Sequence, residues 1–252
     1  MNNGFLITAT VGQAYQQFAL NLIDSLDEHY PDAPVMVSTI PEWADSFKMY
    51  DNVVEIRSDG PNNIRNKLWA LDKTPFDKTC YLDADLEIKD ERIQGVWDLL
   101  DDNHDMAFTV ICPPCGATTA IYKEEGEREI RDNNIERHLR YHGGFFLYHN
   151  NDTALKAVSM WWDKWQEINE NPKWWDNHPE YFRPNMNWDQ FTWWYIITKL
   201  MPELKIQEIE NNTHYQYQWN MNSFIPKFVD LPEDFEPIIW HHTAATLKQR
   251  GK

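Results

Sequence analysis

Residues 78–88 read Lys78-Thr79-Cys80-Tyr81-Leu82-Asp83-Ala84-Asp85-Leu86-Glu87-Ile88, an apolar run followed by two acids and a second apolar run. Alternate residues of a strand point to the same side, so we expect Asp83 and Asp85 to project together where the first run ends. Two carboxylates placed in this way can hold a divalent cation and leave it coordination positions for a diphosphate. Because solvated aspartate pairs are common in loops, Asp-x-Asp alone is weak support for such a site.

Strand-like and helix-like segments alternate before this run. Apolar residues recur with helical spacing from Gln13 onward, and the other segments are short strands at 5–10, 35–37 and 53–56 and a helix at 64–71. Such alternation favours an α/β fold with a mostly parallel sheet flanked by helices. Ligands of these sheets bind beyond the carboxyl ends of the strands. A nucleotide site is therefore expected where the 5–10 strand and the Asp83 strand end.

The pattern is looser after Asp85. We expect a strand at 106–111, a tight turn into another strand at 141–148, and helices at 153–169 and 190–200, the first capped by Asn151 or Asp152. The charged residues 123–140 favour a solvated helix or loop over a recognition element. Asp189 is a candidate N-cap of the last helix, a role that a functional one can accompany.

Composition restricts the function. The chain has 252 residues, of which 23 are basic and 40 acidic, for a net charge of −17. This balance argues against non-specific attraction to nucleic acid or anionic membranes, although it leaves a local basic patch open. The 13 Trp, 11 Tyr and 12 Phe suit an aromatic core and a site that stacks on bases or sugar rings.

Cysteine spacing and targeting signals add little. Cys112 and Cys115 lack a second pair of zinc ligands nearby, so the two prolines between them indicate a rigid loop. We see no signal peptide and no run of about 20 apolar residues. A cytoplasmic protein without a membrane span is therefore expected.

Several short segments carry a resemblance to a known family. They are Thr8-Ala9-Thr10 with Tyr15, Asn66-Lys67-Leu68-Trp69-Ala70-Leu71, Tyr81-Leu82-Asp83-Ala84-Asp85, Gly143-Gly144-Phe145, Asp189-Gln190, and Ile238-Ile239-Trp240-His241-His242 with Lys248. Together they resemble a glycosyltransferase of the GT-A fold, most of all the glycogenin-like retaining group that uses nucleotide-diphosphate sugars. The resemblance spans most of the chain and implies one domain over 1–252. Its nucleotide-binding half would be 1–110, and 111–252 would hold the acceptor half and the C-terminal metal and phosphate motif.

The resemblance also implies roles for single residues. Those expected to contact the nucleotide sugar are Thr8, Ala9, Thr10, Tyr15, Lys67, Asp83, Ala84, Asp85, Gly143, Gly144 and Lys248. Asp83, Asp85 and His242 would hold Mn²⁺ or Mg²⁺, with His241 as a neighbour of the ligand. The expected catalytic residues are Asp189, Gln190 and His142. Two positions depart from the family pattern, because His142 stands where Asn is usual and Ala245 where Gly is usual.

The function implied is metal-dependent transfer of a hexose, with UDP-linked donors favoured and retention at the sugar carbon. The cation and two lysines would neutralise charge on the departing diphosphate. The acceptor stays open among a glycan, a lipid-linked sugar, a protein and a modified nucleic acid, the last through a patch of Arg128, Arg131, Arg137 and Arg140. The oligomeric state is also open.

Two other functions compete with this one. A non-catalytic carbohydrate- or nucleotide-sugar-binding protein on a transferase fold would have no need for a metal bound to a diphosphate. A nucleotidyltransferase normally has a Gly-rich, basic phosphate loop after the first strand, and Val11-Gly12-Gln13 lacks that composition.

Overall fold

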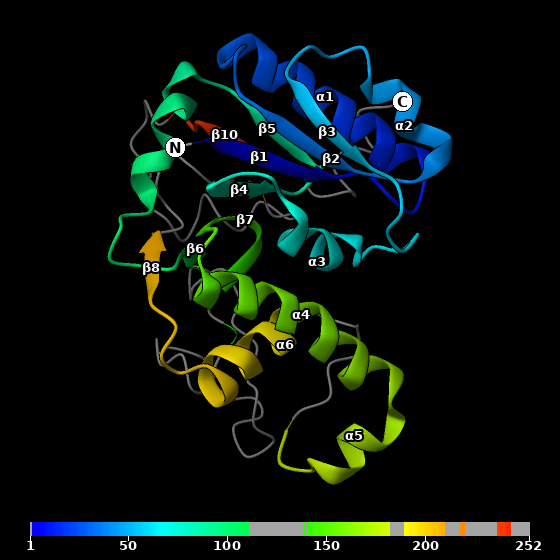
Figure 1. Ribbon diagram of the computed structural model, residues 1–252, viewed down its shortest axis with the longest axis vertical. Coiled ribbons are helices and arrows are strands. Elements are labelled where there is room, and N and C mark those ends of the chain that lie inside the picture. The colour runs from blue at the N-terminus through cyan, green and yellow to red at the C-terminus, as the bar shows by residue number, and fades with distance from the viewer. Residues whose placement is uncertain are drawn as a thin grey trace.

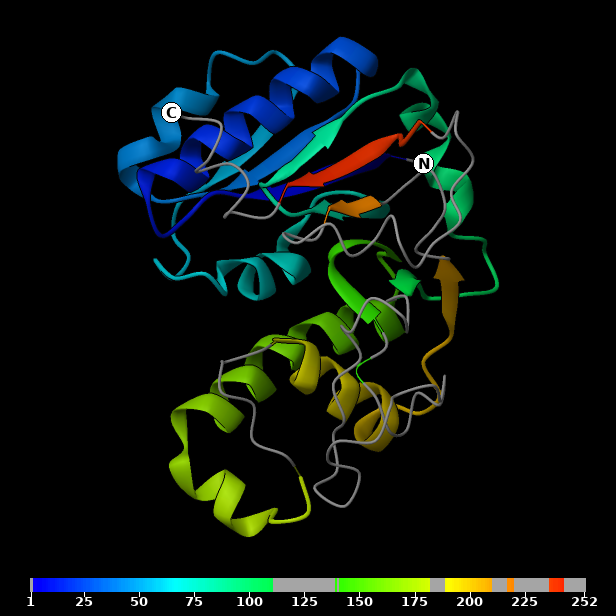
Figure 2. The ribbon, with the colours of Figure 1, turned by 180° about the vertical axis from the view of Figure 1, so that it is seen from behind.

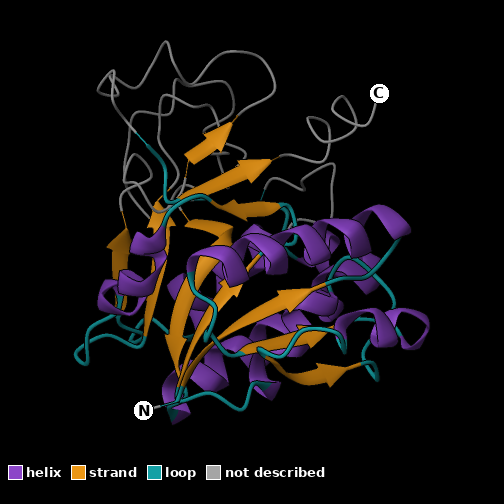
Figure 3. Cartoon of the chain, turned by 90° about the horizontal axis from the view of Figure 1, so that it is seen from above, coloured by secondary structure: helices purple, strands orange, loops and turns teal. Residues whose placement is uncertain are grey.

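A computed structural model describes residues 2–110, 139, 141–181, 189–209, 217–219 and 236–242. In this part of the chain, seven strands form one sheet in the order β3-β2-β1-β4-β7-β6-β8 (Figure 1). Their bounds are β1 Asn3–Thr8, β2 Val35–Ser38, β3 Val53–Arg57, β4 Lys78–Leu82, β6 Met106–Val110, β7 Tyr141–His149 and β8 Ile206–Ile209. Seen from above, successive strands are rotated against one another, as is usual for such sheets (Figure 3).

Most neighbouring strands run parallel. The pairs β1–β2, β2–β3, β1–β4 and β6–β8 are parallel, whereas β7 runs antiparallel between β4 and β6. The prediction of an α/β fold with a mostly parallel sheet is confirmed. Ile7 lies opposite Leu82, so the carboxyl ends of β1 and β4 reach the same edge of the sheet.

Helices cover both faces of this sheet. Helix α1 (Gln13–His29) buries Ala19, Leu22, Ile23 and Leu26 against one face, to which alternate β1 residues Phe5 and Ile7 point. Leu6 points to the other face, in the cluster that contains residues of α3 (Asn66–Ala70), α4 (Asp152–Glu170) and α6 (Asp189–Tyr195). This alternation explains the unbroken apolar runs at 5–7 in β1 and 80–82 in β4, because both sides of each strand are buried.

The remaining helices among the described residues are short. They are α2 (Ala44–Phe47), α5 (Pro172–Asn177), 3-10 helices at Pro41–Trp43, Leu71–Lys73 and Glu91–Leu99, and a π-helical turn at Ile196–Leu200 that follows α6. The helix expected at 190–200 is thus an α-helix that changes to a π-turn. Asn151 caps α4 by accepting a hydrogen bond from the Ala154 N–H at 2.8 Å, as predicted. No described helix combines the length and the apolar character that crossing a membrane requires.

A small second sheet joins the end of the described chain to the residues after Asp85. It has the order β5-β10-β9, formed by β5 (Leu86–Ile88), β10 (Ile239–His242) and β9 (Tyr217–Trp219). Strand β10 runs antiparallel to β5, beside which it lies in Figure 2. Because of this pairing, two histidines from the far end of the sequence reach the Asp-x-Asp segment.

Candidate functional site

Asp83 and Asp85 lie in a turn, which corrects the expectation that strand alternation alone would aim them. Strand β4 ends at Leu82, and the Leu86 N–H donates to the Asp83 carbonyl at 3.1 Å. The turn is fixed from both sides, because the Asp83 N–H donates to the Gly144 carbonyl at 2.8 Å and the Asp85 carbonyl accepts from the His242 N–H at 2.9 Å. Main-chain bonds from β7 and β10 thus hold the two acids in place.

His241 completes a group of three potential metal ligands with these acids. One ligand atom from each of Asp83, Asp85 and His241 lies within 4.8 Å of the others. His241 is only 5% exposed, and its Nε2 lies 3.3 Å from Asp85 Oδ1. Burial lowers the pKa of His241, but the hydrogen bond to Asp85 and its charge outweigh burial and raise that pKa above its usual value. Two carboxylates and one imidazole are a donor set that suits Mn²⁺ or Mg²⁺.

His242, which we expected to be the ligand, lies beside Glu87 instead. Its Nε2 is 2.6 Å from Glu87 Oε2, and within the described ranges its buried Nδ1 has no hydrogen-bond partner. Neighbouring residues of a strand point to opposite sides, so His241 and His242 cannot both face the acids. The structure thus places His241, and not His242, beside the two aspartates. His242 was the expected ligand because it lies six residues before Lys248, a spacing that fits the family motif better than that of His241. Lys248 itself lies outside the described residues, as do Cys112, Cys115 and the arginine patch.

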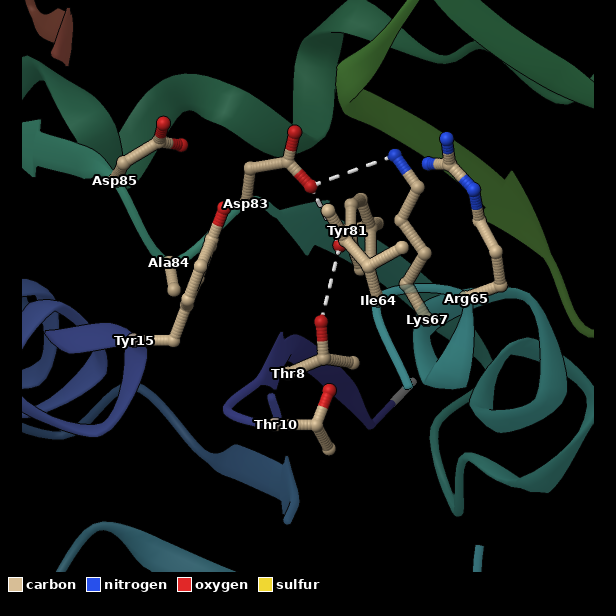
Figure 4. A pocket seen from close by; sticks show the side chains of 10 residues that line it. All are labelled: Thr8, Thr10, Tyr15, Ile64, Arg65, Lys67, Tyr81, Asp83, Ala84 and Asp85. Carbon is tan, nitrogen blue, oxygen red and sulfur yellow. Dashed lines mark hydrogen bonds and ion pairs between the residues drawn. The ribbon is translucent and has the colours of Figure 1, made fainter. Parts of the chain in front are cut away.

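A pocket of about 120 Å³ opens beside the turn (Figure 4). We name it the Asp83 pocket; its lining residues are Thr8, Thr10, Tyr15, Ile64, Arg65, Lys67, Tyr81, Asp83, Ala84 and Asp85. The Tyr81 hydroxyl donates to Asp83 Oδ1 at 2.7 Å and lies 3.2 Å from Thr8 Oγ1. Ala9, also expected at the site, is fully buried and does not line the pocket. The carboxyl ends of β1 and β4 therefore form one wall, where a nucleotide site was predicted.

Tyr15 and Thr10 reach the pocket from the segment after β1. Burial, followed by the nearby charges of Asp85 and Asp83, raises the pKa of Tyr15, so its ring presents a neutral hydroxyl to the pocket. The Thr10 hydroxyl donates to the Asn63 carbonyl at 2.8 Å, which ties the end of β1 to the loop before α3.

Asp189 is held between two cations. Its Oδ2 lies 2.6 Å from Lys67 Nζ, and its Oδ1 lies 3.3 Å from Arg65 Nη1. Burial raises the pKa of Asp189, but the charges of Lys67 and Arg65 outweigh that effect and lower it to about 2. Asp189 is the first residue of α6, and its carbonyl accepts from Trp161 Nε1 at 2.9 Å, so packing against α4 fixes its position. Sequence reasoning missed Arg65, because only the tertiary contact with α6 distinguishes it.

The two glycines of β7 bring its backbone close to these side chains. The turn expected at Gly143 and Gly144 is instead part of the strand. A Cβ on Gly144 would lie 2.8 Å from Asp83 Oδ2, whereas one on Gly143 would lie 3.5 Å from both Asp189 Oδ2 and Lys67 Nζ. The Gly143 carbonyl accepts from Lys67 Nζ at 3.3 Å. Gly144 thus lets the β7 backbone lie closer to Asp83 than a residue with a Cβ would allow.

His142 and Gln190, two of the expected catalytic residues, stand at the edge of this group. The His142 ring lies 5.2 Å from that of His241, centre to centre, and its Nδ1 accepts from the Gly144 N–H. Burial first, and then His241, lowers the pKa of His142 to about 3. The Gln190 side chain donates to the Tyr141 carbonyl at 3.4 Å. The structure therefore brings together Lys67, Asp83, Asp85, His142, Gly143, Gly144 and Asp189, and the roles expected of these residues stay predictions.

Comparison with known proteins places the fold among glycosyltransferases. No family model matches the chain, and no curated protein matches it by sequence. Solved structures do match. The glycosyltransferase GlyE of Streptococcus pneumoniae has a TM-score of 0.61 and 15% identity, and the match covers 96% of this chain and 55% of GlyE. Mouse xyloside xylosyltransferase 1 has a TM-score of 0.59 and 12% identity, with 98% of this chain and 99% of that chain covered, and an active-site variant of LgtC has a TM-score of 0.55 and 13% identity, with 96% and 87% covered.

The likeness is one of fold. This chain spans about half the length of GlyE, and its identity to all three proteins is low. The resemblance to a GT-A glycosyltransferase fold is confirmed at that level. The nearer assignment to the glycogenin-like group stays a prediction.

Proposed function

We propose that this protein is a metal-dependent glycosyltransferase that moves a hexose from a nucleotide-diphosphate sugar, favouring a UDP-linked donor, to an acceptor with retention. The observation that carries the proposal is the convergence of Asp83, Asp85 and His241 within 4.8 Å at the rim of the Asp83 pocket. The site lies at the carboxyl ends of β1 and β4, where ligands of parallel sheets bind. The fold shared with glycosyltransferases supports the same conclusion.

Each charged residue has a task in such a reaction. Asp83, Asp85 and His241 would hold Mn²⁺ or Mg²⁺, which when bound supplies Lewis-acid stabilisation of the leaving diphosphate. Tyr81 orients Asp83 through its 2.7 Å hydrogen bond. Lys67, whose Nζ lies 3.6 Å from Asp83 Oδ1, would add positive charge beside the diphosphate, where negative charge develops as the sugar–phosphate bond breaks. In our proposal Lys248 contributes a second such charge, as the sequence predicted.

Asp189 is suited to the sugar side of the reaction. Its carboxylate stays ionised, since the pKa is lowered to about 2, and an anion there can stabilise positive charge on the sugar ring or orient the acceptor hydroxyl. Gln190 and His142 would line the same side. Retention would then proceed by attack on the face of the departing phosphate, without a protein nucleophile. This part of the proposal rests on the family resemblance.

The nucleotide would lie in the Asp83 pocket, against the wall formed by Thr8, Thr10, Tyr15 and Ile64. The Tyr15 ring offers a stacking surface for the base. A uridine donor follows from the family resemblance. The acceptor is proposed only as a class with a free hydroxyl or amide: a glycan, a lipid-linked sugar, a protein or a modified nucleic acid.

The test is metal-dependent release of nucleotide from a panel of UDP- and GDP-sugars. We expect one donor to be hydrolysed slowly with Mn²⁺ and not after chelation, and Asp85→Asn to reduce release by at least about 100-fold. Asp51→Asn, in an exposed turn away from the pocket, is the matched control and should behave as wild type. Equal release by wild type and Asp85→Asn would contradict the metal site. Binding of a nucleotide sugar without any release would support the alternative, a non-catalytic binding protein.

A further inference from the structure

Arg65 and Lys67 share one buried carboxylate. Arg65 directly precedes α3 and Lys67 belongs to it, so their side chains project from the same segment (Figure 4). Both side chains contact Asp189. The Asp189 side chain is 9% exposed, and each of its oxygens faces a different cation, Oδ1 towards Arg65 and Oδ2 towards Lys67. Asp189 is therefore paired with two cations, one more than is needed to neutralise its charge.

Lys67 has competing acceptors. Its Nζ lies 2.6 Å from Asp189 Oδ2, 3.3 Å from the Gly143 carbonyl and 3.6 Å from Asp83 Oδ1. A diphosphate held beside Asp83 would add further negative oxygens within reach of this ammonium group. If Lys67 turned towards them and were the sole cation on Asp189, a buried carboxylate would lose its counter-charge, which is strongly unfavourable.

Arg65 is suited to prevent this loss. A guanidinium group stays charged at any relevant pH, and its planar fork holds a carboxylate in a defined orientation. Arg65 is itself largely buried, with 13% of its side chain exposed, so solvent weakens the interaction little. Its Nη1 lies 3.3 Å from Asp189 Oδ1, and its side chain stands beside that of Lys67 in the pocket (Figure 4).

We propose that Arg65 is a positioning residue of the transfer site, which keeps Asp189 in place so that Lys67 can turn to the donor diphosphate. This proposal rests on the proposed function. It separates two tasks that a single lysine could not perform together. Although Arg65 lines the pocket, in this proposal it acts on the donor through Asp189.

The sharing of Asp189 is tested without any ligand, by thermal unfolding of Arg65→Met, Lys67→Met and the double variant. Each single variant leaves Asp189 one cation and should lower Tm by a few degrees, whereas the double variant should lower it by on the order of 10 °C, more than the sum. In an Asp189→Asn background this excess should vanish. Arg92→Met, which breaks an exposed pair with Asp90, is the control for loss of an arginine. Additive effects would overturn the proposal whatever the protein binds.

The positioning role is tested by calorimetric titration with UDP in the presence of Mn²⁺. We expect Arg65→Met to weaken UDP binding about tenfold and Arg65→Lys to recover part of the loss. In the Asp189→Asn background, removal of Arg65 should change affinity by less than about twofold. An equal loss in both backgrounds would show direct contact with the ligand and overturn the proposal, and so would unchanged affinity of Arg65→Met. If wild type bound neither UDP nor GDP in the presence of Mn²⁺, the proposed function would be refuted, and the positioning role with it, while the unfolding result would stand.

Discussion

Gly144 provides a test of the metal site, because its backbone lies close to the Asp83 carboxylate. Replacing it with Ala would put a Cβ 2.8 Å from Asp83 Oδ2 and 2.8 Å from His142 Cε1. Both groups, or the Gly144 backbone itself, must therefore move by at least about 0.6 Å to reach ordinary van der Waals contact. The His142 ring is packed near His241, whereas the carboxylate is the end of a side chain. We therefore expect Asp83 to move, at the cost of its geometry towards a cation.

The magnitude follows from how tightly such ligands must be held. Residues that orient a metal ligand typically contribute 10- to 100-fold to affinity, so we expect Gly144→Ala to weaken Mn²⁺ binding by at least about tenfold. Backbone torsion angles at Gly144 do not require glycine, so the loss of stability should come from these two contacts alone and be about 1–3 kcal/mol. Mn²⁺ affinity is measured by electron paramagnetic resonance or calorimetry on folded protein, and requires no donor sugar.

Gly143→Ala is the matched control for this prediction. The added Cβ there would lie 3.5 Å from its nearest neighbours, Asp189 Oδ2 and Lys67 Nζ, which is ordinary contact. It should bind Mn²⁺ within about twofold of wild type. If Gly144→Ala bound the ion as well as Gly143→Ala, the close approach of β7 to Asp83 would not support a metal site, and our reasoning would be refuted.

Three further predictions concern the supporting residues. Tyr81→Phe removes the hydrogen bond to Asp83 Oδ1 and should weaken Mn²⁺ binding about tenfold, whereas Tyr148→Phe, which removes a buried bond to the Leu71 carbonyl, should lower stability by about 1 kcal/mol without affecting the ion. Asp189 has its pKa lowered from 3.8 to about 2, so it contributes about 2 kcal/mol to stability above pH 4, which is lost as the pH falls through 2; urea unfolding should show this loss in wild type and not in Asp189→Asn. Gly4→Ala would put a Cβ into the fully buried Phe76 ring and should destabilise the protein by about 1–3 kcal/mol, measured by urea unfolding, with Mn²⁺ affinity unchanged.

The sheet and the location of the site could be predicted because they depend on local patterns. Strands β1 and β4 are buried on both faces, which leaves a continuous apolar signal in the sequence. Their parallel pairing places Thr8 and Asp83 at one edge of the sheet. The spacing of apolar residues also identified α1, whose buried side is the predicted one.

What could not be predicted depends on contacts between distant segments. The choice between His241 and His242 is decided by which side of β10 faces Asp85, and β10 pairs with a strand more than 150 residues earlier. Arg65 is one of many charged residues until α6 places Asp189 beside it. Gly143 and Gly144 are extended because they lie between Tyr141, which pairs with β6, and Phe145, which pairs with β4, and this flanking pairing outweighs the turn preference of two glycines.

The most direct test of metal-dependent transfer is UDP release from the hydrolysed donor as Mn²⁺ is titrated, compared among wild type, His241→Ala and His242→Ala. Our account predicts that His241→Ala needs at least about tenfold more Mn²⁺ for half-maximal release, because it lacks a ligand. His242→Ala, which loses a contact with Glu87, should retain the wild-type dependence on Mn²⁺. A shifted dependence in His242→Ala alone, or release that ignores Mn²⁺ in all three proteins, would contradict the account.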